Sequence, residues 1–433
     1  MNFETRSSRR FDDSYLAFRH PSGRRVFLYP KQGWHSTYAV IGTDYGSADV
    51  RFQRSDAESP ETIPAGTAHF LEHKLFESED QDAFERFAAL GASANAYTSF
   101  ENTSYLFSCT EKFEESLEVL LDFVQSPYFT PENVAKEMGI IGQEIDMYED
   151  DPQWRVMFNL FGAMYHNHPI REDIAGTRES IAEITPECLY HCYDTFYNLN
   201  HMVLAVAGRV DPERVVEICD RVLRTSKEVQ VQRLFDPEPR EVVRTYTEQA
   251  MPVAIPLFEL GFKCDGSLKR DEKFSAAADV LLEILASDAS PLFKRLTDAG
   301  VISEASFGYE FFEGSGFAMT LFSGESNDPK RAAEMIVEEL ERYKREGIPA
   351  EDFERARRCV YGSNISAFNS VENIATTLMM FSFKNFELFR YIDAVADLTL
   401  EDVTACMEQI LNPDCRTLSV ISPLPEEESE VQS

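Results

Sequence analysis

Basic residues are scarce in this sequence. It contains 41 lysine and arginine residues against 75 aspartate and glutamate residues, so its formal net charge is −34. Binding to a nucleic-acid backbone requires a basic surface, and so does docking on an anionic membrane. We therefore expect neither nucleic acid nor a membrane as a partner. An acidic surface mainly serves solubility, although it also attracts basic or unfolded peptides.

Long hydrophobic runs are also missing. No stretch approaches the roughly 20 apolar residues that span a bilayer, and the first ten residues, MNFETRSSRR, carry no apolar segment after their charges. We therefore expect no secretory signal and a soluble, cytoplasmic protein. The eight cysteines are scattered, which in a reducing compartment predicts free thiols. Cys188 and Cys192 flank His191, but no second pair completes a zinc motif, so an ordinary helix face is favoured.

The sequence repeats itself weakly at an offset of about 215 residues. The clearest pair starts at Ile184 (ITPECLYHCYDTFYNLNHMVLAVAGRVDP) and at Leu398 (LTLEDVTACMEQILNPDCRTLSVISPLP), and both copies read as a helix followed by a strand. A second pair sets TPENVAKEMGIIGQE against IPAEDFERARRCVYGS from Ile348, and a third sets HFLEHKLF against DVLLEILA from Asp279. The order of all three is preserved, which indicates a duplicated fold.

The repeat predicts two homologous domains over residues 1–225 and 246–433, joined by a charged linker over 226–245. Strands alternate with helices, and the runs include hairpin-like strand pairs such as NAYTSFENTSYLFSCT. We therefore expect an α+β fold, in which helices pack on a mostly antiparallel sheet in each domain. The last residues, PLPEEESEVQS, predict a disordered acidic tail.

The segment HFLEH carries the strongest chemical signal. In a helix, His69 and His73 lie one turn apart on one face, with Glu72 beside them. A hydrolytic zinc site needs three protein ligands and an open position for water. The histidines supply two ligands, and Glu72 is placed to act as the general base. Taken alone, the motif could also be a solvated helix face. A second histidine pair, His166 and His168, is better explained by a loop near Pro169.

A long helix from Pro131 offers the third ligand. Its apolar residues follow a strict alternation of four and three, and Thr130 can cap it. Glu137 and Glu144 lie seven residues apart on nearly the same face. Glu144 adjoins the apolar stripe, where an unpaired carboxylate would be costly, so a metal would explain it. Glu137 could orient a histidine from behind the metal, or be a structural acid. Gly139 and Gly142 indicate that another element packs closely on this helix.

These residues resemble the pitrilysin/insulinase family of zinc metallopeptidases. HFLEH matches the family's HxxEH, and Glu137 with Glu144 resembles its paired distal glutamates. GTAHFLEH, GASANAYTSFENTSY and FYNLNHMVLAVAG also occur in family order, so the resemblance covers nearly the whole chain. It is closest to the short bacterial branch, similar to mitochondrial processing peptidase subunits. It implies zinc on His69, His73 and Glu144, water activation by Glu72, and support from Glu137.

The resemblance also implies how substrate and partner bind. Asn95 and Ala96 would lie on an edge strand that pairs with an extended peptide, although Asn95 could simply bond its own backbone in a turn. In the family, an arginine and a tyrosine of the second domain hold the substrate carbonyl. Here Thr297 or Leu296 stands at the arginine position and Ser303 at the tyrosine position. Arg295 and Tyr309 lie nearby, but would replace the pair only along a different loop path.

We therefore expect a zinc-dependent metalloendopeptidase that hydrolyses unfolded peptides inside a two-subunit clamshell. A homologous partner subunit would supply the missing pair, unless the chain forms a homodimer. The alternative is a metal-binding scaffold or maturation subunit, for example in modification of elongation factor P. The intact ligand set and Glu72 favour the enzyme.

Overall fold

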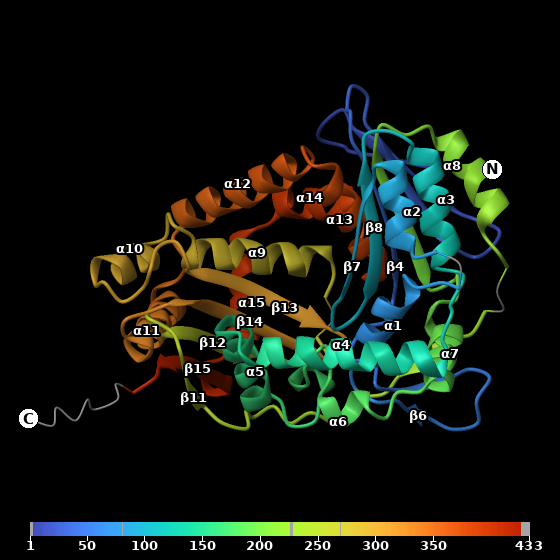
Figure 1. Ribbon diagram of the computed structural model, residues 1–433. Helices are drawn as coiled ribbons and strands as arrows, with labels where there is room; N and C mark the ends of the chain where they lie inside the picture. Colours follow the sequence, from blue (N-terminus) through green and yellow to red (C-terminus); the bar gives the residue numbers. More distant parts are fainter. Residues whose placement is uncertain (1–2, 80, 226–227, 269, 426–433) are drawn as a thin grey trace, which may run out of the picture. The chain divides into compact units, whose positions relative to one another are not determined.

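The computed structural model describes residues 3–79, 81–225, 228–268 and 270–425 (Figure 1). The chain forms two compact units. The first comprises Met1–Ile145, Glu172–Phe235 and Tyr361–Ala396, and the second comprises Asp146–Arg171, Asp236–Val360 and Asp397–Ser433. Both units mix helices with strands, as the α+β prediction requires. No helix among the described residues is long and apolar enough to cross a membrane.

The first unit is built on a seven-stranded sheet with the order β1-β2-β3-β9-β4-β8-β7. Only the β3 and β9 pair is parallel. A small sheet, β10-β5-β6, lies in the same unit, and its strand β10 falls within the predicted linker. The strands are β1 (Glu4–Ser7), β2 (Ser14–Arg19), β3 (Arg25–Pro30), β4 (Thr37–Thr43), β5 (Arg51–Arg54), β6 (Glu61–Thr62), β7 (Ser93–Thr98), β8 (Thr103–Cys109), β9 (Met202–Gly208) and β10 (Val231–Arg233).

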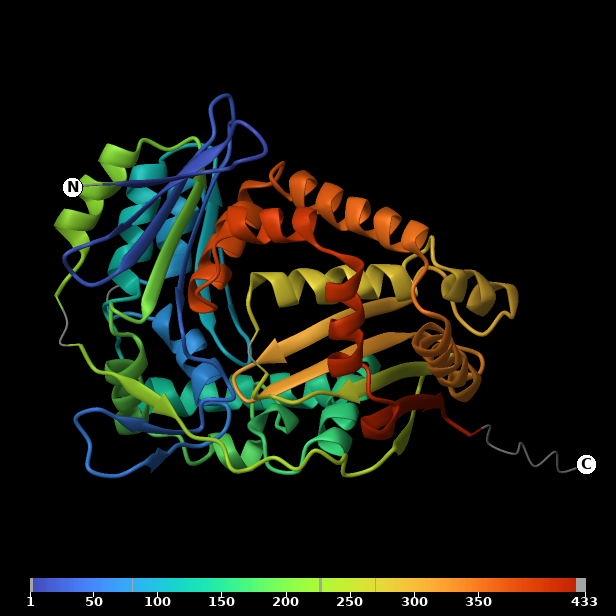
Figure 2. The ribbon, with the colours of Figure 1, turned by 180° about the vertical axis from the view of Figure 1, so that it is seen from behind.

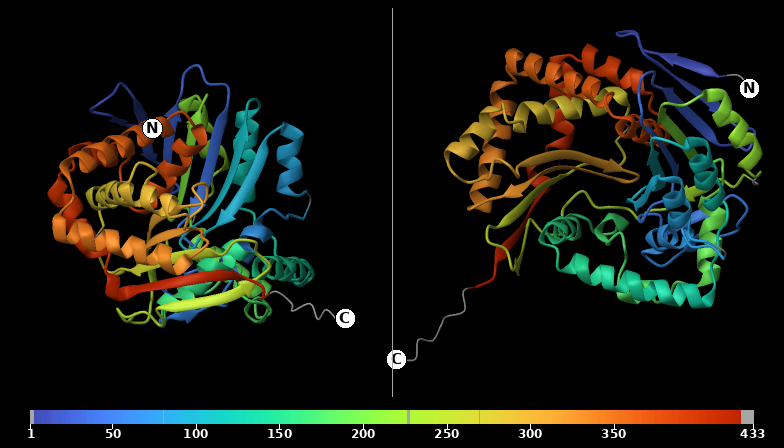
Figure 3. Two further views of the ribbon diagram at one scale, coloured as in Figure 1. Left: turned by 90° about the vertical axis from the view of Figure 1, so that its left-hand side faces the viewer. Right: turned by 45° about the horizontal axis from the view of Figure 1, so that its top comes forward.

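Helices cover both faces of the large sheet. Helices α2 and α3 pack on one face and α13 packs on the other (Figure 3). The ring of Phe87 in α2 contacts that of Phe107 in β8, and the Met379 sulfur of α13 fills the space beside Gly42 of β4. The helices of this unit are α1 (Thr67–Leu75), α2 (Ala83–Leu90), α3 (Phe113–Phe123), α4 (Pro131–Glu149), α6 (Arg178–Ile181), α7 (Pro186–Phe196), α8 (Pro212–Val222), α13 (Val371–Phe383) and α14 (Leu388–Asp397). This double cover explains why every residue of β4 and β9 is buried.

The second unit carries a five-stranded sheet with the order β11-β15-β12-β14-β13. Helix α5 packs on β11, β12 and β15, and α9 contacts β13 and is itself in contact with α15 (Figure 2). The strands are β11 (Tyr246–Met251), β12 (Leu257–Lys263), β13 (Gly308–Gly314), β14 (Phe317–Glu325) and β15 (Arg416–Pro423). The helices are α5 (Pro152–Met164), α9 (Glu272–Ala286), α10 (Pro291–Asp298), α11 (Pro329–Glu346), α12 (Ala350–Ala367) and α15 (Leu400–Ile410), with short 3-10 turns at Pro169–Arg171 and Pro413–Cys415.

The two sheets share one topology. The order β3-β9-β4-β8-β7 in the first unit corresponds strand by strand to β11-β15-β12-β14-β13 in the second. In each sheet the first two of these strands are parallel and the remaining pairs are antiparallel. The predicted fold of homologous, mostly antiparallel domains is therefore confirmed. Most of the predicted acidic tail, residues 426–433, lies outside the described residues.

Several local features of the chain follow from its sequence. Helix α2 ends at Gly91, whose φ of 73° lies in the left-handed region that glycine adopts without strain. The segment NAYTSFENTSYLFSCT forms the hairpin β7–β8. All eight cysteines are free thiols. His191 of α7 bonds Glu61 rather than joining Cys188 and Cys192 in a metal cluster.

Candidate metal centre

Helix α1 carries His69, Glu72 and His73, and its first turn is held tightly. Its N-cap residue, Gly66, has a φ of 87°, and a Cβ atom there would lie 2.4 Å from the carbonyl oxygen of Ala175. Only glycine fits this close approach. The Thr67 hydroxyl donates a hydrogen bond to the carbonyl oxygen of Pro64 at 2.7 Å. The helix has nine residues, so its stability depends on the tertiary packing around it.

Helix α4 brings Glu137 and Glu144 to this helix. Its N-terminus is capped reciprocally: the Thr130 hydroxyl accepts from the backbone N–H of Asn133 at 3.2 Å, and the Asn133 side chain accepts from that of Thr130 at 2.9 Å. Ile141 and Ile145 are buried and fix the orientation of the helix. The two glutamates therefore project from a rigid element toward α1.

Close packing was predicted at both glycines of α4, and the structure shows it at one of them. A Cβ atom on Gly142 would lie 2.6 Å from Nη1 of Arg178 in α6, so a neighbouring element does approach there. Nothing lies within 4 Å of the corresponding point on Gly139, and the prediction was wrong for that residue.

His69, His73 and Glu144 converge. Nε2 of His69 lies 3.7 Å from Oε1 of Glu144, and Nε2 of His73 lies 3.4 Å from Oε2. Potential ligand atoms of these three residues all lie within 4.8 Å of one another, and this is the one such cluster found among the described residues. Two imidazoles and a carboxylate are a donor set of catalytic zinc sites. The site therefore fits zinc.

Glu137 fixes the orientation of His73. Nδ1 of His73 lies 3.0 Å from Oε1 of Glu137. When Nδ1 donates its hydrogen to this carboxylate, the lone pair of Nε2 points toward Glu144 and is free to bind a metal. Burial alone would raise the pKa of Glu137, but the hydrogen bond to His73 lowers it below its usual value. The fully buried ammonium group of Lys74 lies 3.8 Å from Oε2 of Glu137 and adds to this effect.

The pKa values of the two histidines shift in opposite directions. Burial and the neighbouring His73 lower the pKa of His69 to about 4, so this imidazole is neutral near pH 7. Burial would also lower the pKa of His73, but the hydrogen bond to Glu137 and the charges of Glu72 and Glu144 raise it above its usual value. A metal binds only neutral imidazole, so its binding must release the proton that His73 holds at lower pH.

The side chain of Glu72 extends from α1 to the β7–β8 hairpin. Its Oε2 accepts a hydrogen bond from the hydroxyl of Thr98, the last residue of β7, at 2.7 Å. Burial raises the pKa of Glu72, and the Thr98 hydroxyl opposes this shift. A partly desolvated carboxylate of raised pKa is suited to take a proton from water. Thr98 was missed from the sequence, because only the hairpin register places it beside α1.

Asn95 and Ala96 lie on β7, which is the edge strand of the large sheet. Ala96 pairs with Tyr105 of β8. The side-chain oxygen of Asn95 accepts a hydrogen bond from the backbone N–H of Ala96 at 2.9 Å. This local bond is the one expected if asparagine bonds its own backbone. A peptide that adds to this edge must compete with the Asn95 side chain for that N–H.

Positions of the missing donor pair lie in the second unit. Leu296 is fully buried in α10, and the Thr297 hydroxyl donates to the carbonyl oxygen of Lys294 at 3.0 Å. The neighbouring candidates are also engaged. Arg295 forms an ion pair with the buried Glu339 at 2.7 Å, and the Tyr309 hydroxyl donates to Glu283 at 2.9 Å.

The second unit carries a counterpart of the centre in which His73 and Glu137 are replaced. In the predicted repeat, Glu283 of α9 stands at the position of His73, and Arg355 of α12 stands at that of Glu137. Nη1 of Arg355 lies 3.9 Å from Oε1 of Glu283. An internal pair of opposite charges thus occupies the place of the histidine and its supporting carboxylate.

His166 and His168 have structural roles. The carboxylate of Glu238 accepts the backbone N–H groups of His166, Asn167 and His168 at 2.8–2.9 Å. The His168 ring bonds the carbonyl oxygen of Ser315 at 2.9 Å. These contacts fix the loop before Pro169, in agreement with the predicted loop role of the two histidines.

Comparisons with known proteins agree with this geometry. Residues 57–178 match the insulinase family (peptidase family M16), and residues 183–359 match the peptidase M16 inactive domain. The chain is 40% identical to the uncharacterized zinc protease YmfH of Bacillus subtilis (strain 168), over 93% of this chain and 95% of that protein. It is 33% identical to the mitochondrial-processing peptidase subunit beta of Neurospora crassa, over 39% of this chain and 36% of that subunit.

A solved structure is similar throughout. The M16-like peptidase from Alicyclobacillus acidocaldarius superposes with a TM-score of 0.90 at 35% identity, covering 98% of this chain and 99% of that one. The ligand cluster and the duplicated sheets agree with these matches. The chain therefore belongs to the insulinase family of peptidases, family M16.

Proposed function

We propose that this protein is a zinc-dependent metalloendopeptidase that hydrolyses unfolded peptides. The observation that carries the proposal is the convergence of His69, His73 and Glu144 beside the half-buried carboxylate of Glu72. When bound, zinc supplies Lewis acidity, which brings the pKa of water near 7 and polarises a substrate carbonyl. The free thiols support a reducing, cytoplasmic location.

Residues of the chain orient the ligands, transfer the proton and bind the substrate in this proposal. Glu137 holds the His73 ring so that Nε2 faces the centre. Glu72 takes a proton from the attacking water and passes it to the leaving amine, while the Thr98 hydroxyl holds its carboxylate in place. The edge of β7 at Asn95 and Ala96 binds the extended substrate through backbone hydrogen bonds. The proposed duplicated halves are residues 1–225 and 246–433, joined by 226–245.

A second, homologous subunit completes the proposed enzyme. The contacts of Arg295 with Glu339 and of Tyr309 with Glu283 support this, because they direct both side chains to acids of the second unit. A relative among the comparisons is itself named as a subunit of a processing peptidase. In this proposal the partner contributes the arginine and tyrosine across a clamshell. A homodimer would lack these two donors.

A scaffold or maturation role is the alternative, and the same two engaged side chains favour it. Metal analysis of the purified chain combined with a quenched-peptide cleavage assay separates the two functions. Stoichiometric zinc with cleavage that Glu72→Gln abolishes supports the peptidase. Stoichiometric zinc without cleavage, either alone or with a homologous subunit that carries the arginine and tyrosine, would leave the scaffold role.

A further inference from the structure

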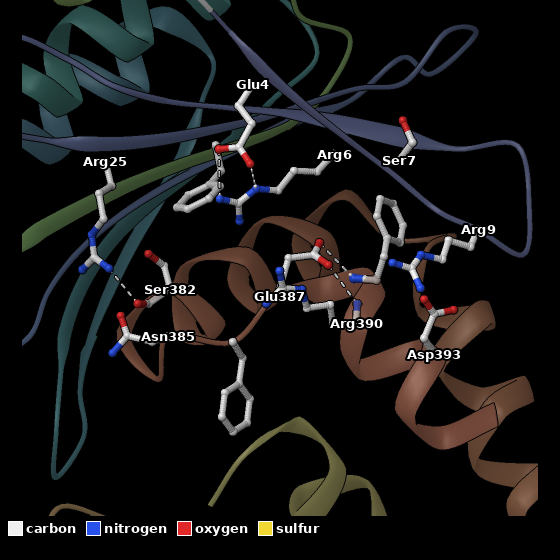
Figure 4. A pocket seen from close by; sticks show the side chains of 13 residues that line it. Glu4, Arg6, Ser7, Arg9, Arg25, Ser382, Asn385, Glu387, Arg390 and Asp393 are labelled. Atoms are coloured by element: carbon white, nitrogen blue, oxygen red, sulfur yellow. Dashed lines mark hydrogen bonds and ion pairs between the residues drawn. The ribbon is translucent and has the colours of Figure 1, made fainter. Parts of the chain in front are cut away.

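A polar cavity of about 700 Å³ opens in the first unit, away from the metal-ligand cluster. Its walls are the edge strand β1, the start of β3, and the turn that joins α13 to α14 (Figure 4). Four arginines line it, namely Arg6, Arg9, Arg25 and Arg390. This concentration of positive charge is unusual in a chain whose formal net charge is −34.

The acids of the cavity are already engaged. Glu4 accepts two hydrogen bonds from the Arg6 guanidinium, at 3.1 and 3.2 Å. Asp393 pairs with Arg10 at 2.9 Å. Glu387 accepts the hydroxyl of Tyr15 at 2.7 Å and the first backbone N–H groups of α14 at 2.9–3.1 Å. Each carboxylate therefore already has donors of its own.

The other three arginines have donors to spare. Within the described part of the chain, Arg9, Arg25 and Arg390 form no ion pair with a carboxylate. Nη1 of Arg25 donates to the carbonyl oxygen of Ser382 at 2.7 Å, which points the guanidinium at the α13–α14 turn (Figure 4). Its Nε is buried and has no hydrogen-bond partner among the described residues.

The orphaned donor of Arg25 has an energetic cost. A buried donor of a charged group loses its hydration without recovering a hydrogen bond. Burial lowers the pKa of Arg25; the charge of Asp44 opposes this shift, and that of Arg19 adds to it. A negatively charged group in the cavity would act as Asp44 does and stabilise the charged guanidinium.

Aromatic rings also line the cavity. Phe27, Phe386 and Phe389 lie in its walls together with the polar residues Ser7, Ser382 and Asn385. The volume falls within the range of about 300–1,000 Å³ typical of small-molecule sites, where a few charged groups orient a largely apolar ligand. A polyanion is disfavoured, because the acidic surface around this local patch repels it.

We propose that this cavity binds a small organic dianion, a phosphate monoester or a dicarboxylate, whose apolar part packs on the phenylalanines. Arg25 is the anchor, because its planar donors suit the two oxygens of such a group. Arg9 and Arg390 complete the charge compensation. Such a site stands whether or not the chain is a peptidase, because no residue of the cavity belongs to the metal-ligand cluster.

Isothermal titration calorimetry on the full chain tests the proposal with four probes: phenyl phosphate, phenylsuccinate, inorganic phosphate and benzyl alcohol. Phenyl phosphate or phenylsuccinate is expected to bind at least about tenfold more tightly than inorganic phosphate, since burial of a ring removes apolar surface from water. Benzyl alcohol, which lacks the charge, should not bind. The tighter of the two aromatic anions assigns the ligand to phosphate or carboxylate chemistry.

Three variants locate the binding. Arg25→Gln and Arg390→Gln are each expected to weaken binding by roughly tenfold or more, as loss of a charged hydrogen bond predicts. Arg209→Gln makes the same change of charge at an exposed site outside the cavity and should leave binding unchanged. The exposed Arg390 keeps the test valid if Arg25→Gln fails to fold. Absence of binding by both aromatic anions, or equal weakening by all three variants, would overturn the proposal.

Discussion

Nδ1 of His73 lies 3.0 Å from Oε1 of Glu137, so a carboxylate two helical turns before Glu144 orients a ring that faces Glu144. The two glutamates of α4 therefore act on the same imidazole from opposite nitrogens. One contributes an oxygen to the ligand cluster, and the other fixes which nitrogen is free to join it.

These two roles predict that substitution of either glutamate weakens zinc binding to a different extent. Glu144→Gln should lower zinc occupancy most, because it removes a ligand oxygen. Glu137→Gln should weaken zinc binding by roughly 10- to 100-fold, which is typical when the hydrogen-bond partner of a ligating histidine is lost. Glu132→Gln, an exposed change in the first turn of the same helix, is the control. Metal content after dialysis against a chelator series ranks the three, and a reversed order would exchange the two roles.

Glu72→Gln should retain zinc and lose peptide hydrolysis by on the order of 10²–10⁴, the usual contribution of a general base. Thr98→Val should lower kcat while leaving zinc content unchanged, because it removes the hydroxyl that holds the carboxylate. Thr98→Ser should restore most of the activity. Cleavage by Glu72→Gln at the unmodified rate would refute the assignment of the base.

Arg295→Gln and Tyr309→Phe should leave peptidase activity nearly unchanged, because both side chains are held by acids of the second unit. The purified chain alone should be a poor peptidase. Adding a homologous subunit with the family's arginine and tyrosine should raise turnover by about 10²–10³ for each donor restored. Robust zinc-dependent cleavage by the single chain, lost on changing Arg295 or Tyr309, contradicts this expectation.

The two glycines of α4 form a matched pair for stability. Gly139→Ala should stabilise the protein by about 1 kcal/mol, because alanine favours a helix interior and no atom obstructs its Cβ. Gly142→Ala should give a smaller gain or a loss, because the Arg178 guanidinium must move aside. Melting temperatures measured by calorimetry compare them. Equal gains from both changes would show that Arg178 does not constrain this face.

Glu259 of β12 predicts a pH dependence of stability. Burial raises its pKa to about 8, with the nearby charge of Glu310 acting in the same direction, and its Oε2 has no hydrogen-bond partner among the described residues. The folded state therefore binds a proton more tightly than the unfolded state. Its contribution to stability is complete below the unfolded pKa, near 4.5, and is lost as the pH rises toward about 8.

Glu259→Gln mimics the protonated side chain and should remove most of this slope between pH 5 and pH 8, so that the variant gains stability relative to the parent at the alkaline end. Glu408→Gln, at an exposed position of α15, serves as the control. Unfolding temperatures recorded across the pH range provide the comparison. An unchanged slope in Glu259→Gln would assign the effect to other groups.

Local patterns in the sequence were sufficient for much of the centre. Each of these patterns lies within a single helix, so it can be recognised from neighbouring residues. They are the spacing of His69 and His73 in α1, and the cap at Thr130 and the apolar stripe around Ile141 in α4. The Thr98 contact depends instead on the β7–β8 register and on where that hairpin lies against α1. Gly139 shows that a glycine inside a helix does not by itself indicate a close neighbour, because nothing lies within 4 Å of its Cβ position.

Long-range contacts account for what sequence patterns missed in the fold. The arginine cavity joins β1 to a turn more than 370 residues later, and no local signal connects Arg25 with Ser382. The strand β10 was predicted as linker because a three-residue strand has no periodicity to detect. Its pairing with β5 depends on tertiary contact. Short and distant elements are specified by the whole fold rather than by their own residues.

The pair formed by Glu283 and Arg355 bears on how a chelator would act on the two copies of the duplicated fold. In the second unit, Arg355 faces the carboxylate of Glu283 where the first unit has Glu137 and His73. That pair draws on no ion, whereas zinc at the proposed site would hold α1 and α4 of the first unit together. A chelator should then lower the unfolding temperature of the first copy and leave that of the second unchanged.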